Sequence, residues 1–233
     1  MSDDNSVQRL TAPALAPHVI HRPPVVDAIT VLKIAAVATM VIDHSAIAFF
    51  GDSMWMRQIG RFAMPLFAGL VGYNLGRTRS VDRYALRLLL LGLVSQPLYV
   101  AAFGGAWHEL NVGFTLFVGV CAAAMLHNWR VWPLGLALVL VPFIDYGVPG
   151  VLYIVAVSFV ARYGWPAFVI AVIASIGFNG PAYVAATVCA SVLVIATLRF
   201  SSSRRWPTRI ERIAFYTFYP THLAGIAVLA FIL

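Results

Sequence analysis

Long apolar segments with short polar connections make up most of this chain, and they decide what it can fold into. Hydrophobic residues account for 61% of its 233 residues and charged residues for 11%. A soluble domain is about 45–50% apolar and about 25% charged, so this composition indicates an integral membrane protein. Because a span needs about 20 apolar residues, the chain has room for about eight to ten helices and for no second, soluble domain.

We therefore expect an all-α, polytopic membrane helix bundle of about nine transmembrane helices. The expected helices cover residues 26–50, 57–77, 84–104, 111–127, 131–144, 149–162, 165–178, 181–199 and 211–232. Most arginine-rich connections share one side of the membrane if the N-terminus is cytoplasmic, and the positive-inside rule selects that orientation. The segments between 131 and 178 are short for a bilayer core of about 30 Å, so we expect them to tilt, to be shielded by neighbours or to thin the membrane locally.

Residues 1–25 differ from the rest of the chain. They contain Pro13, Pro17, Pro23 and Pro24, and no long apolar run follows a basic start. This composition is typical of a flexible tail, here a cytoplasmic one, rather than of a cleaved signal peptide. A single transmembrane domain then covers residues 26–233.

Basic residues outnumber acidic ones, 16 to 9, but most of them flank apolar segments. Anionic lipid and the insertion machinery explain that distribution, so we expect a lipid bilayer and no nucleic acid as partner. Cys121 and Cys189 lie in apolar segments and predict neither a disulfide nor a metal site. The chain also lacks a Gly-rich phosphate loop, a Gly-x-Ser-x-Gly elbow and a His-Glu-x-x-His motif, so neither soluble-type nucleotide binding nor metalloprotease chemistry is expected.

An acid and an imidazole, Asp43 and His44, are neighbours within the first apolar segment. A bilayer interior penalises ionisable groups by several kcal/mol, so such residues usually face a protein-lined cavity and mark a working site. With the N-terminus inside, other polar residues reach a similar depth: Arg61, Gln96, Asn111, Asp145 and His222. We expect them to surround a cavity that is open toward the exterior.

Six segments of the chain together carry a family resemblance. They are LKIAAVATMVIDH (Leu32 to His44), IGRFAMPLFAGLVGYNLGRTR (Ile59 to Arg79), YALRLLLLGLVSQPLY (Tyr84 to Tyr99), LNVGFTLFVG (Leu110 to Gly119), DYGVPGVL (Asp145 to Leu152) and FYPTHL (Phe218 to Leu223). In this order and spacing they resemble the TraX family of membrane proteins, which is associated with N-terminal acetylation of conjugative pilin. The resemblance implies an acyltransferase of the bacterial inner membrane that uses acetyl-CoA as co-substrate.

His44 is the leading catalytic candidate, because an imidazole can take a proton from an acceptor amine or hydroxyl near neutral pH. The alternative is a neutral histidine bonded to a backbone carbonyl. Asp43 cannot simply be its partner, because adjacent helical residues point about 100° apart. We expect Arg61 to be the counter-ion of Asp43, either in a structural ion pair or in contact with substrate.

Asp145 and His222 each have a structural and a functional interpretation. Asp145 either caps the following helix or orients His44 or His222 across the bundle. His222 follows Pro220, which frees a backbone carbonyl, and either His222 or Tyr219 satisfies that carbonyl. Alternatively, His222 is a second acid/base or a donor to the thioester oxygen.

Cationic and amide side chains are the candidates for binding the donor. Arg79, Arg83 and Arg87 follow one helical face at the cytoplasmic entrance and are either topology anchors or ligands of the CoA phosphates, with Arg87 reaching deepest. Further cations can join them: Lys33, Arg204, Arg205 and Arg209. Gln96 and Asn111 either bond between helices or bind the acyl oxygen or a pantetheine amide.

The resulting hypothesis is an N-acetyltransferase that moves acetyl from cytoplasmic acetyl-CoA to the N-terminal amine of a membrane-inserted pilin, directly or through an acetyl-histidine. A sugar or lipid amine or hydroxyl is the alternative acceptor. A proton-coupled small-molecule transporter, with Asp43, Asp145 and the histidines as relay sites, is the rival from another class. A passive assembly protein is the third. Binding of acetyl-CoA separates the enzyme from both.

Overall fold

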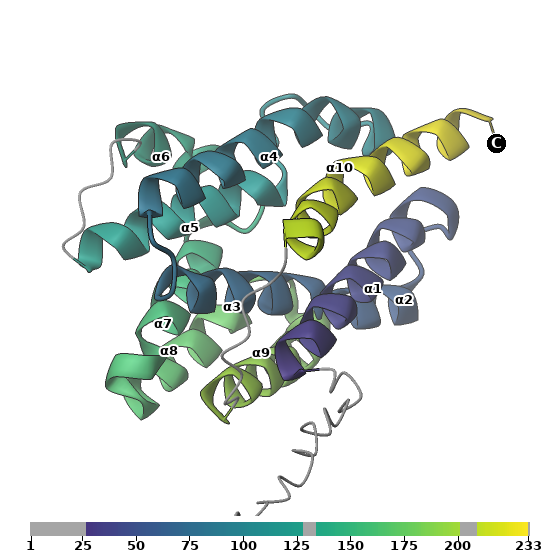
Figure 1. Ribbon diagram of the computed structural model, residues 1–233. Coiled ribbons are helices and arrows are strands. Elements are labelled where there is room, and N and C mark those ends of the chain that lie inside the picture. Colours follow the sequence, from purple (N-terminus) through teal and green to yellow (C-terminus); the bar gives the residue numbers. More distant parts are fainter. Residues whose placement is uncertain (1–26, 128–133, 201–208, 233) are drawn as a thin grey trace, which may run out of the picture.

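Helices form the whole framework of the computed structural model in the part that it describes, residues 27–127, 134–200 and 209–232 (Figure 1). The α-helices are α1 (Ala28–Phe49), α2 (Met54–Gly60), α3 (Ala63–Leu75), α4 (Val81–Phe103), α5 (Val112–Leu126), α6 (Leu134–Leu140), α7 (Gly147–Tyr163), α8 (Trp165–Ile176), α9 (Val184–Phe200) and α10 (Arg209–Ile232). Two 3₁₀ turns, η1 (Val141–Phe143) and η2 (Pro181–Tyr183), precede α7 and α9. The predicted all-α class is confirmed. The predicted tail, Arg204 and Arg205 lie outside the described residues, as does the side chain of Arg209.

Four helical segments are long and apolar enough to cross a membrane: Ala28–Phe49, Val81–Phe103, Pro181–Arg199 and Ile210–Ile232. Helices α5, α7 and α8 are apolar but shorter. The expected count of about nine spans of roughly 20 residues is therefore not confirmed. The second expected helix, 57–77, is divided into α2 and α3 by a turn at Arg61 and Phe62. Pro65 explains the division, because its ring would clash with the Arg61 carbonyl in a continuous helix.

Local sequence signals set several helix ends. The Asp27 side chain accepts a hydrogen bond from the amide of Thr30 at the start of α1. Asn111 caps α5 in the same way, accepting from the amide of Gly113. Helix α4 ends at Gly104, whose φ of 67° is left-handed and therefore suits a glycine. Side-chain caps of this kind contribute about 0.5–2 kcal/mol each.

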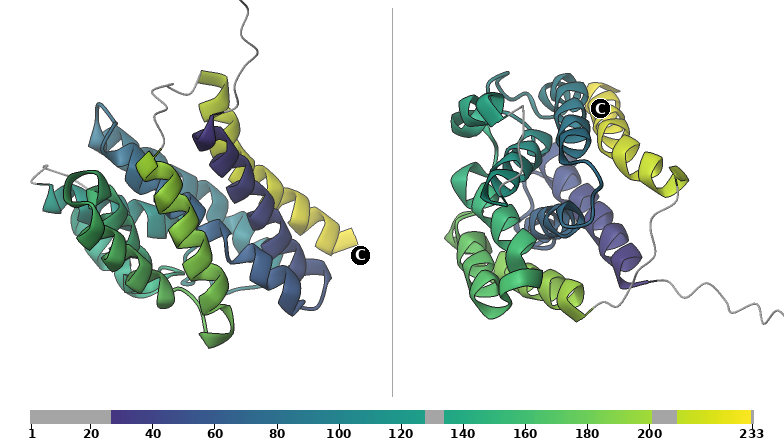
Figure 2. Two further views of the ribbon diagram at one scale, coloured as in Figure 1. Left: turned by 90° about the horizontal axis from the view of Figure 1, so that it is seen from below. Right: turned by 60° about the vertical axis from the view of Figure 1, so that its left-hand side comes forward.

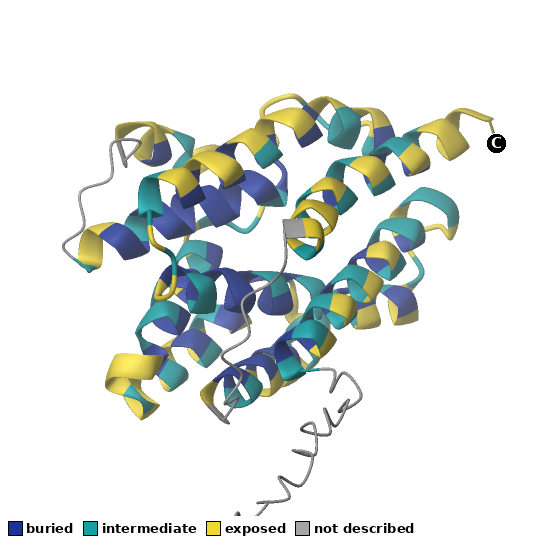
Figure 3. Cartoon of the chain, in the orientation of Figure 1, coloured by how far each residue is buried: buried dark blue, intermediate teal, exposed yellow. Residues whose placement is uncertain are grey.

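Helix α3 lies at the centre of the bundle, where it contacts α1, α5, α7 and α9. Two glycines allow the close approach. A Cβ at Gly69 would lie 2.9 Å from Val194 on α9, and a Cβ at Gly72 would lie 3.0 Å from the Ile154 carbonyl on α7. Residues of α3 are largely buried as a result (Figure 3). This central helix holds the surrounding helices in register around the site described below.

Helices α1, α4 and α10 run in the same direction, with their N-terminal ends at one end of the molecule (Figures 1 and 2). Helix α10 packs along α4 and beside α1, although the rest of the bundle separates it from them in sequence. The outward faces of α4 and α10 carry exposed large apolar residues, such as Leu90, Leu93, Val228 and Leu229 (Figure 3). Exposed apolar faces on helices of this length are typical of a protein that lies in lipid.

Candidate active site

The two histidines singled out in the sequence, His44 on α1 and His222 on α10, are in direct contact. His44 Nδ1 lies 2.7 Å from His222 Nε2, although 178 residues separate them along the chain. The rings are nearly parallel, with an interplanar angle of 11° and centroids 4.9 Å apart. Both residues are half-buried. The sequence predicts that both lie in the membrane, but it does not predict that they touch.

Hydrogen bonding determines which ring nitrogens of the neutral pair carry protons. His222 Nδ1 lies 3.2 Å from the Phe218 carbonyl oxygen, which can only accept, so Nδ1 carries the proton and donates. His222 Nε2 is then unprotonated and accepts a hydrogen bond from His44 Nδ1–H. This assignment leaves His44 Nε2 with a free lone pair. His44 is therefore the base of the pair, and His222 is its hydrogen-bond acceptor.

Aromatic rings surround the imidazole pair. The Phe103 ring meets His44 edge-on, with centroids 5.0 Å apart, and Phe218 stacks on His222 at 5.2 Å. The ring centroid of Tyr219 lies 6.5 Å from that of His44 and 5.6 Å from that of His222. Such packing restricts the orientation of both imidazoles.

His222 does not bond the backbone carbonyl that Pro220 leaves without a donor. Pro220 would free the carbonyl four residues earlier, that of Tyr216, because a proline has no amide hydrogen. His222 contacts the Phe218 carbonyl instead. His222 therefore does not satisfy the Tyr216 carbonyl, and its ring is oriented toward His44.

The counter-ion of Asp43 is Arg57, which corrects the expected pairing with Arg61. Arg57 Nη1 lies 2.8 Å from Asp43 Oδ2, and Arg57 Nε lies 2.9 Å from Asp52 Oδ1. The side chains of Asp43 and Arg57 are each 12% exposed. A nearly buried ion pair of this kind fixes the spacing of α1 and α2, and loss of either partner leaves a buried charge.

A glycine brings α2 close enough to form that ion pair. A Cβ at Gly60 would lie 2.7 Å from the Cα of Asp43 and still closer to its side chain. Because a glycine stands there, α2 approaches α1 directly and Arg57, one turn earlier on α2, reaches Asp43. Arg61 follows the last residue of α2, where the chain turns away into α3.

Arg61 lies over an aromatic ring instead of a carboxylate. Its guanidinium carbon is 5.0 Å from the centroid of the Tyr183 ring, within the range of a cation–π contact. Its Nε is buried and has no hydrogen-bond partner among the described residues. Arg61 nevertheless remains within electrostatic range of Asp43, His44 and Asp145.

Asp145 takes neither of its two expected roles. Helix α7 begins at Gly147 and has Tyr146 as its N-cap, without a side-chain hydrogen bond. Three of the four ring nitrogens of His44 and His222 are already in contact with each other or with the Phe218 carbonyl. Among the described residues, the Asp145 carboxylate has no hydrogen bond to either ring. Asp145 is an exposed residue, so water reaches its carboxylate; partial desolvation by the neighbouring helices raises its pKa, and Arg61 acts in the opposite direction.

Gln96 and Asn111 bond to one another and to backbone. Asn111 Nδ2 donates to the Gly92 carbonyl at 2.9 Å and to Gln96 Oε1 at 2.8 Å. Gln96 Nε2 donates to the carbonyls of Glu109 and Trp107, at 2.9 and 3.5 Å. All amide donors are therefore used inside the protein. The structure places these residues in the interhelical role, joining α4 to the start of α5.

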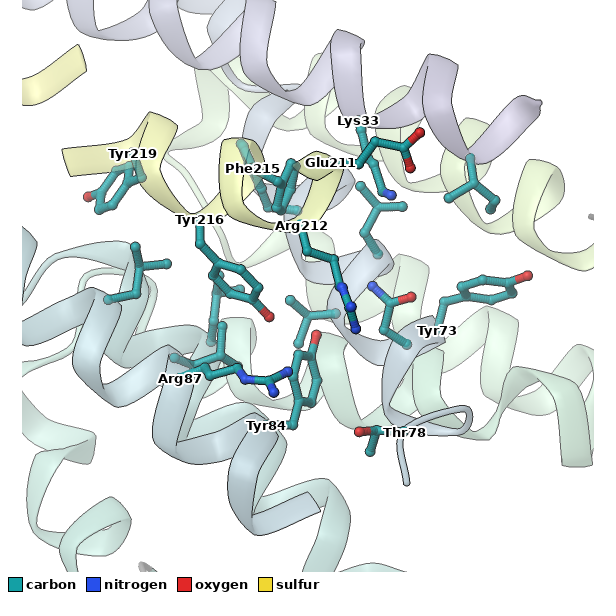
Figure 4. A pocket seen from close by; sticks show the side chains of 18 of the residues that line it. Lys33, Tyr73, Thr78, Tyr84, Arg87, Glu211, Arg212, Phe215, Tyr216 and Tyr219 are labelled. Carbon is teal, nitrogen blue, oxygen red and sulfur yellow. The ribbon is translucent and has the colours of Figure 1, made fainter. Parts of the chain in front are cut away.

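A cavity of about 440 Å³ lies between α1, α3, α4, α5 and α10 (Figure 4). Its charged lining residues are Asp27, Lys33, Arg77, Arg87, Glu211 and Arg212. Lys33, Arg87 and Arg212 have no ion-pair partner in the part of the chain that the structure describes. Arg79 and Arg83 do not line this cavity. The charged end of the cavity is thus a ready site for an anionic group.

The other end of the cavity is apolar and adjoins the imidazole pair. Met40 and Tyr219 line it. Met40 lies one helical turn before His44 on α1, and Tyr219 lies three residues before His222 on α10. In Figure 4, Tyr219 is on the far side of the cavity from Lys33, and Arg212 is nearer the middle. No group of three or more His, Cys, Asp or Glu side chains that could hold a metal ion occurs among the described residues.

Sequence reasoning missed some of these residues. Arg57 is not among the residues predicted for the site, although it lies one turn before Gly60 and Arg61. It also missed the cavity face of α10. Residues of that face recur at helical spacing and line the cavity: Arg212, Phe215, Tyr216 and Tyr219. This spacing in the sequence could have indicated that these side chains share one face of the last helix.

Comparison with known proteins identifies similar sequences but no similar solved structure. The family model described as TraX protein matches residues 28–230. Protein TraX of Escherichia coli is 30% identical over 221 residues, which is 86% of each chain, and that of strain K12 is 29% identical over 220 residues, with the same coverage. A probable fimbrial assembly protein FimC, serogroup H1, of Dichelobacter nodosus is 35% identical over 72 residues, 29% of this chain and 30% of that protein. No solved structure matches.

Proposed function

This chain belongs to the TraX family, and from that membership and the geometry of its site we propose that it is a membrane acetyltransferase. It transfers acetyl from acetyl-CoA to an acceptor amine on the opposite side of the bacterial inner membrane. The observation that carries the proposal is the position of the imidazole pair. The pair adjoins the apolar end of a cavity whose other end presents Lys33, Arg87 and Arg212, which form no ion pair within the described part of the chain.

The donor binds with its phosphates at the charged end of the cavity. Lys33, Arg87 and Arg212 offer cationic donors that form no ion pair among the described residues, and they outnumber the two carboxylates of this end, Asp27 and Glu211. Guanidinium groups suit phosphate because they form paired, charge-assisted hydrogen bonds. The apolar remainder of the cavity then accommodates the pantetheine arm. Since Arg79 and Arg83 lie outside the lining, the phosphates are assigned to Arg87 and its two neighbours rather than to them.

His44 acts as general base at the inner end. Its Nε2 takes a proton from the acceptor amine while the amine nitrogen attacks the thioester carbonyl carbon. The tetrahedral intermediate then expels the CoA thiolate, and the proton on His44 Nε2 passes to that sulfur. The products are the acetylated amine and CoA thiol. A transient acetyl-histidine at the same nitrogen is the alternative route.

His222 is a positioning residue in this mechanism. By accepting from His44 Nδ1–H, it holds the ring with Nε2 toward the reactants. It also stabilises the imidazolium that forms when Nε2 is protonated. A carboxylate performs the same task in Ser-His-Asp triads, and here a neutral imidazole takes its place.

The acceptor is the N-terminal amine of a membrane-inserted pilin. The family resemblance supports this substrate. The name of the Dichelobacter nodosus relative, a probable fimbrial assembly protein, also points to pilus subunits. A sugar or lipid amine or hydroxyl requires the same proton transfer, so a panel of acceptors distinguishes these classes.

The direct test is acetyl transfer by the purified full-length protein in lipid nanodiscs, with labelled acetyl-CoA and a pilin N-terminal peptide. Wild type should transfer the label, and His44→Ala should not. His108→Ala is the matched control, because His108 is exposed in the loop between α4 and α5 and belongs to no part of the site. A wild-type protein that neither binds acetyl-CoA nor acetylates any acceptor would refute the proposal and favour the transporter or assembly class.

A further inference from the structure

The inner end of the cavity has a composition unlike that of its mouth. All charged lining residues lie in the first two turns of α1, α4 or α10, directly before α1, or shortly after α3. The residues toward the imidazole pair are apolar or aromatic: Met40, Phe67, Leu91, Val112, Leu116 and Tyr219. A ligand that enters through the mouth with an apolar leading group therefore meets an environment that suits it.

Two lining residues of this apolar end, Met40 and Tyr219, lie near His44 in the fold. Met40 is 5% exposed and precedes His44 by one turn. Tyr219 is 6% exposed, and its ring is near both imidazoles. Both are packed against other buried residues, including Leu223 and Ala102. Any group that approaches His44 from the cavity must therefore be accommodated beside Met40 and Tyr219.

We propose that Met40 and Tyr219 limit the acyl group of the donor to acetyl. This inference rests on the proposed function, in which the thioester travels acyl end first toward His44. The carbonyl carbon must reach the acceptor nitrogen beside His44, so every further methylene of the acyl chain needs volume that these two side chains now occupy. Packed interiors have few voids, so a longer chain would have to displace them.

The expected selectivity follows from the size of one methylene. An extra methylene in a close-fitting apolar pocket changes kcat/KM by about 10- to 200-fold. Acetyl-CoA should therefore be a better donor than propionyl-CoA by about that factor, and butyryl-CoA should be poorer still. We call Met40 and Tyr219 the end wall of the donor site. A site without this end wall would use the longer acyl chains with little loss of kcat/KM.

Met40→Ala is the most direct variant for the test. It removes volume beside the acyl group, and it leaves the ring contacts of Tyr219 with both imidazoles in place. With the acceptor held constant, the ratio of kcat/KM for butyryl-CoA to that for acetyl-CoA should rise by about tenfold or more in Met40→Ala. Met56→Ala is the matched control, because Met56 is a buried methionine on α2 outside the cavity. Its donor ratio should equal that of wild type.

Tyr219→Phe separates size from hydrogen bonding. The ring and its volume remain while the hydroxyl is lost, so the donor ratio should stay as in wild type. If Met40→Ala is poorly folded, judged by gel filtration in detergent, Met40→Val replaces it and is read by the same ratio.

The proposal is overturned if wild type uses butyryl-CoA as well as acetyl-CoA, or if a folded Met40→Ala or Met40→Val keeps the wild-type ratio. Failure of the proposed function has a different signature, since no acyl-CoA would then act as a donor for any variant. Each outcome therefore tests either the end wall or the underlying activity.

Discussion

His44 Nδ1 and His222 Nε2 lie 2.7 Å apart, so the first and last helices of the described chain share one hydrogen bond in the membrane domain. The bond ties the protonation state of one ring to the other. It also leaves His44 Nε2 as the free base, because His222 Nδ1 is committed to the Phe218 carbonyl. This asymmetry gives the two histidines different expected phenotypes.

His44→Ala should reduce acetyl transfer by about 10²- to 10⁴-fold, the usual contribution of a general base. His222→Ala should reduce it less, because the base remains but its orientation is lost. His222→Gln should recover part of the activity of His222→Ala, since an amide oxygen can accept from His44 Nδ1–H. Initial rates with labelled acetyl-CoA measure all three. Equal losses in His222→Ala and His222→Gln would contradict the positioning role.

Replacing Asp43 or Arg57 singly should destabilise the protein by about 3–5 kcal/mol, because each change strands a buried charge. Asp43→Leu together with Arg57→Met should be less destabilising than either single change. Thermal unfolding in detergent measures the effect. Arg61→Gln is the control, since Arg61 makes no ion pair with Asp43 in the structure. A larger loss in Arg61→Gln than in Arg57→Gln would favour the pairing first expected from sequence.

Gly60→Ala should lower the unfolding midpoint, because the added methyl group would collide with Asp43 and separate α2 from α1. Overpacking of this kind costs about 1–3 kcal/mol. Gly225→Ala is the matched control, since a Cβ at Gly225 on α10 meets no atom within 4 Å. Gly225→Ala should leave the midpoint unchanged or raise it slightly. The same midpoint for both variants would show that α1 and α2 are not in close contact.

Arg87→Gln should weaken acetyl-CoA binding by roughly tenfold or more, since a hydrogen bond to a charged group contributes about 1.5–3 kcal/mol. Lys33→Gln should act in the same direction. Arg83→Gln is the control, because Arg83 lies near the start of the same helix but outside the cavity. Equilibrium binding to the purified protein gives the dissociation constants. Equal weakening by Arg83→Gln would indicate a diffuse basic surface rather than the cavity mouth.

The sequence by itself determined the helical class and directed attention to Asp43, His44, Arg87 and His222. Each of these stands out because a polar group in an apolar helix is costly and rare, and that cost depends only on local composition. Hydropathy also located most helices within a few residues. It did not reveal that Pro65 divides the second expected helix or that α6 ends at Leu140, where the 3₁₀ turn η1 follows.

Only the tertiary structure decided which of these polar groups meet. Arg57 and Arg61 are one helical turn apart, and the close contact at Gly60 selects Arg57 as the partner of Asp43. His44 meets His222, and not Asp145, because α10 packs beside α1 and rotates its histidine toward that helix. The cavity also requires five helices at once. Composition reports how a residue is solvated, whereas partners depend on helix rotation and crossing, which arise from packing of the whole bundle.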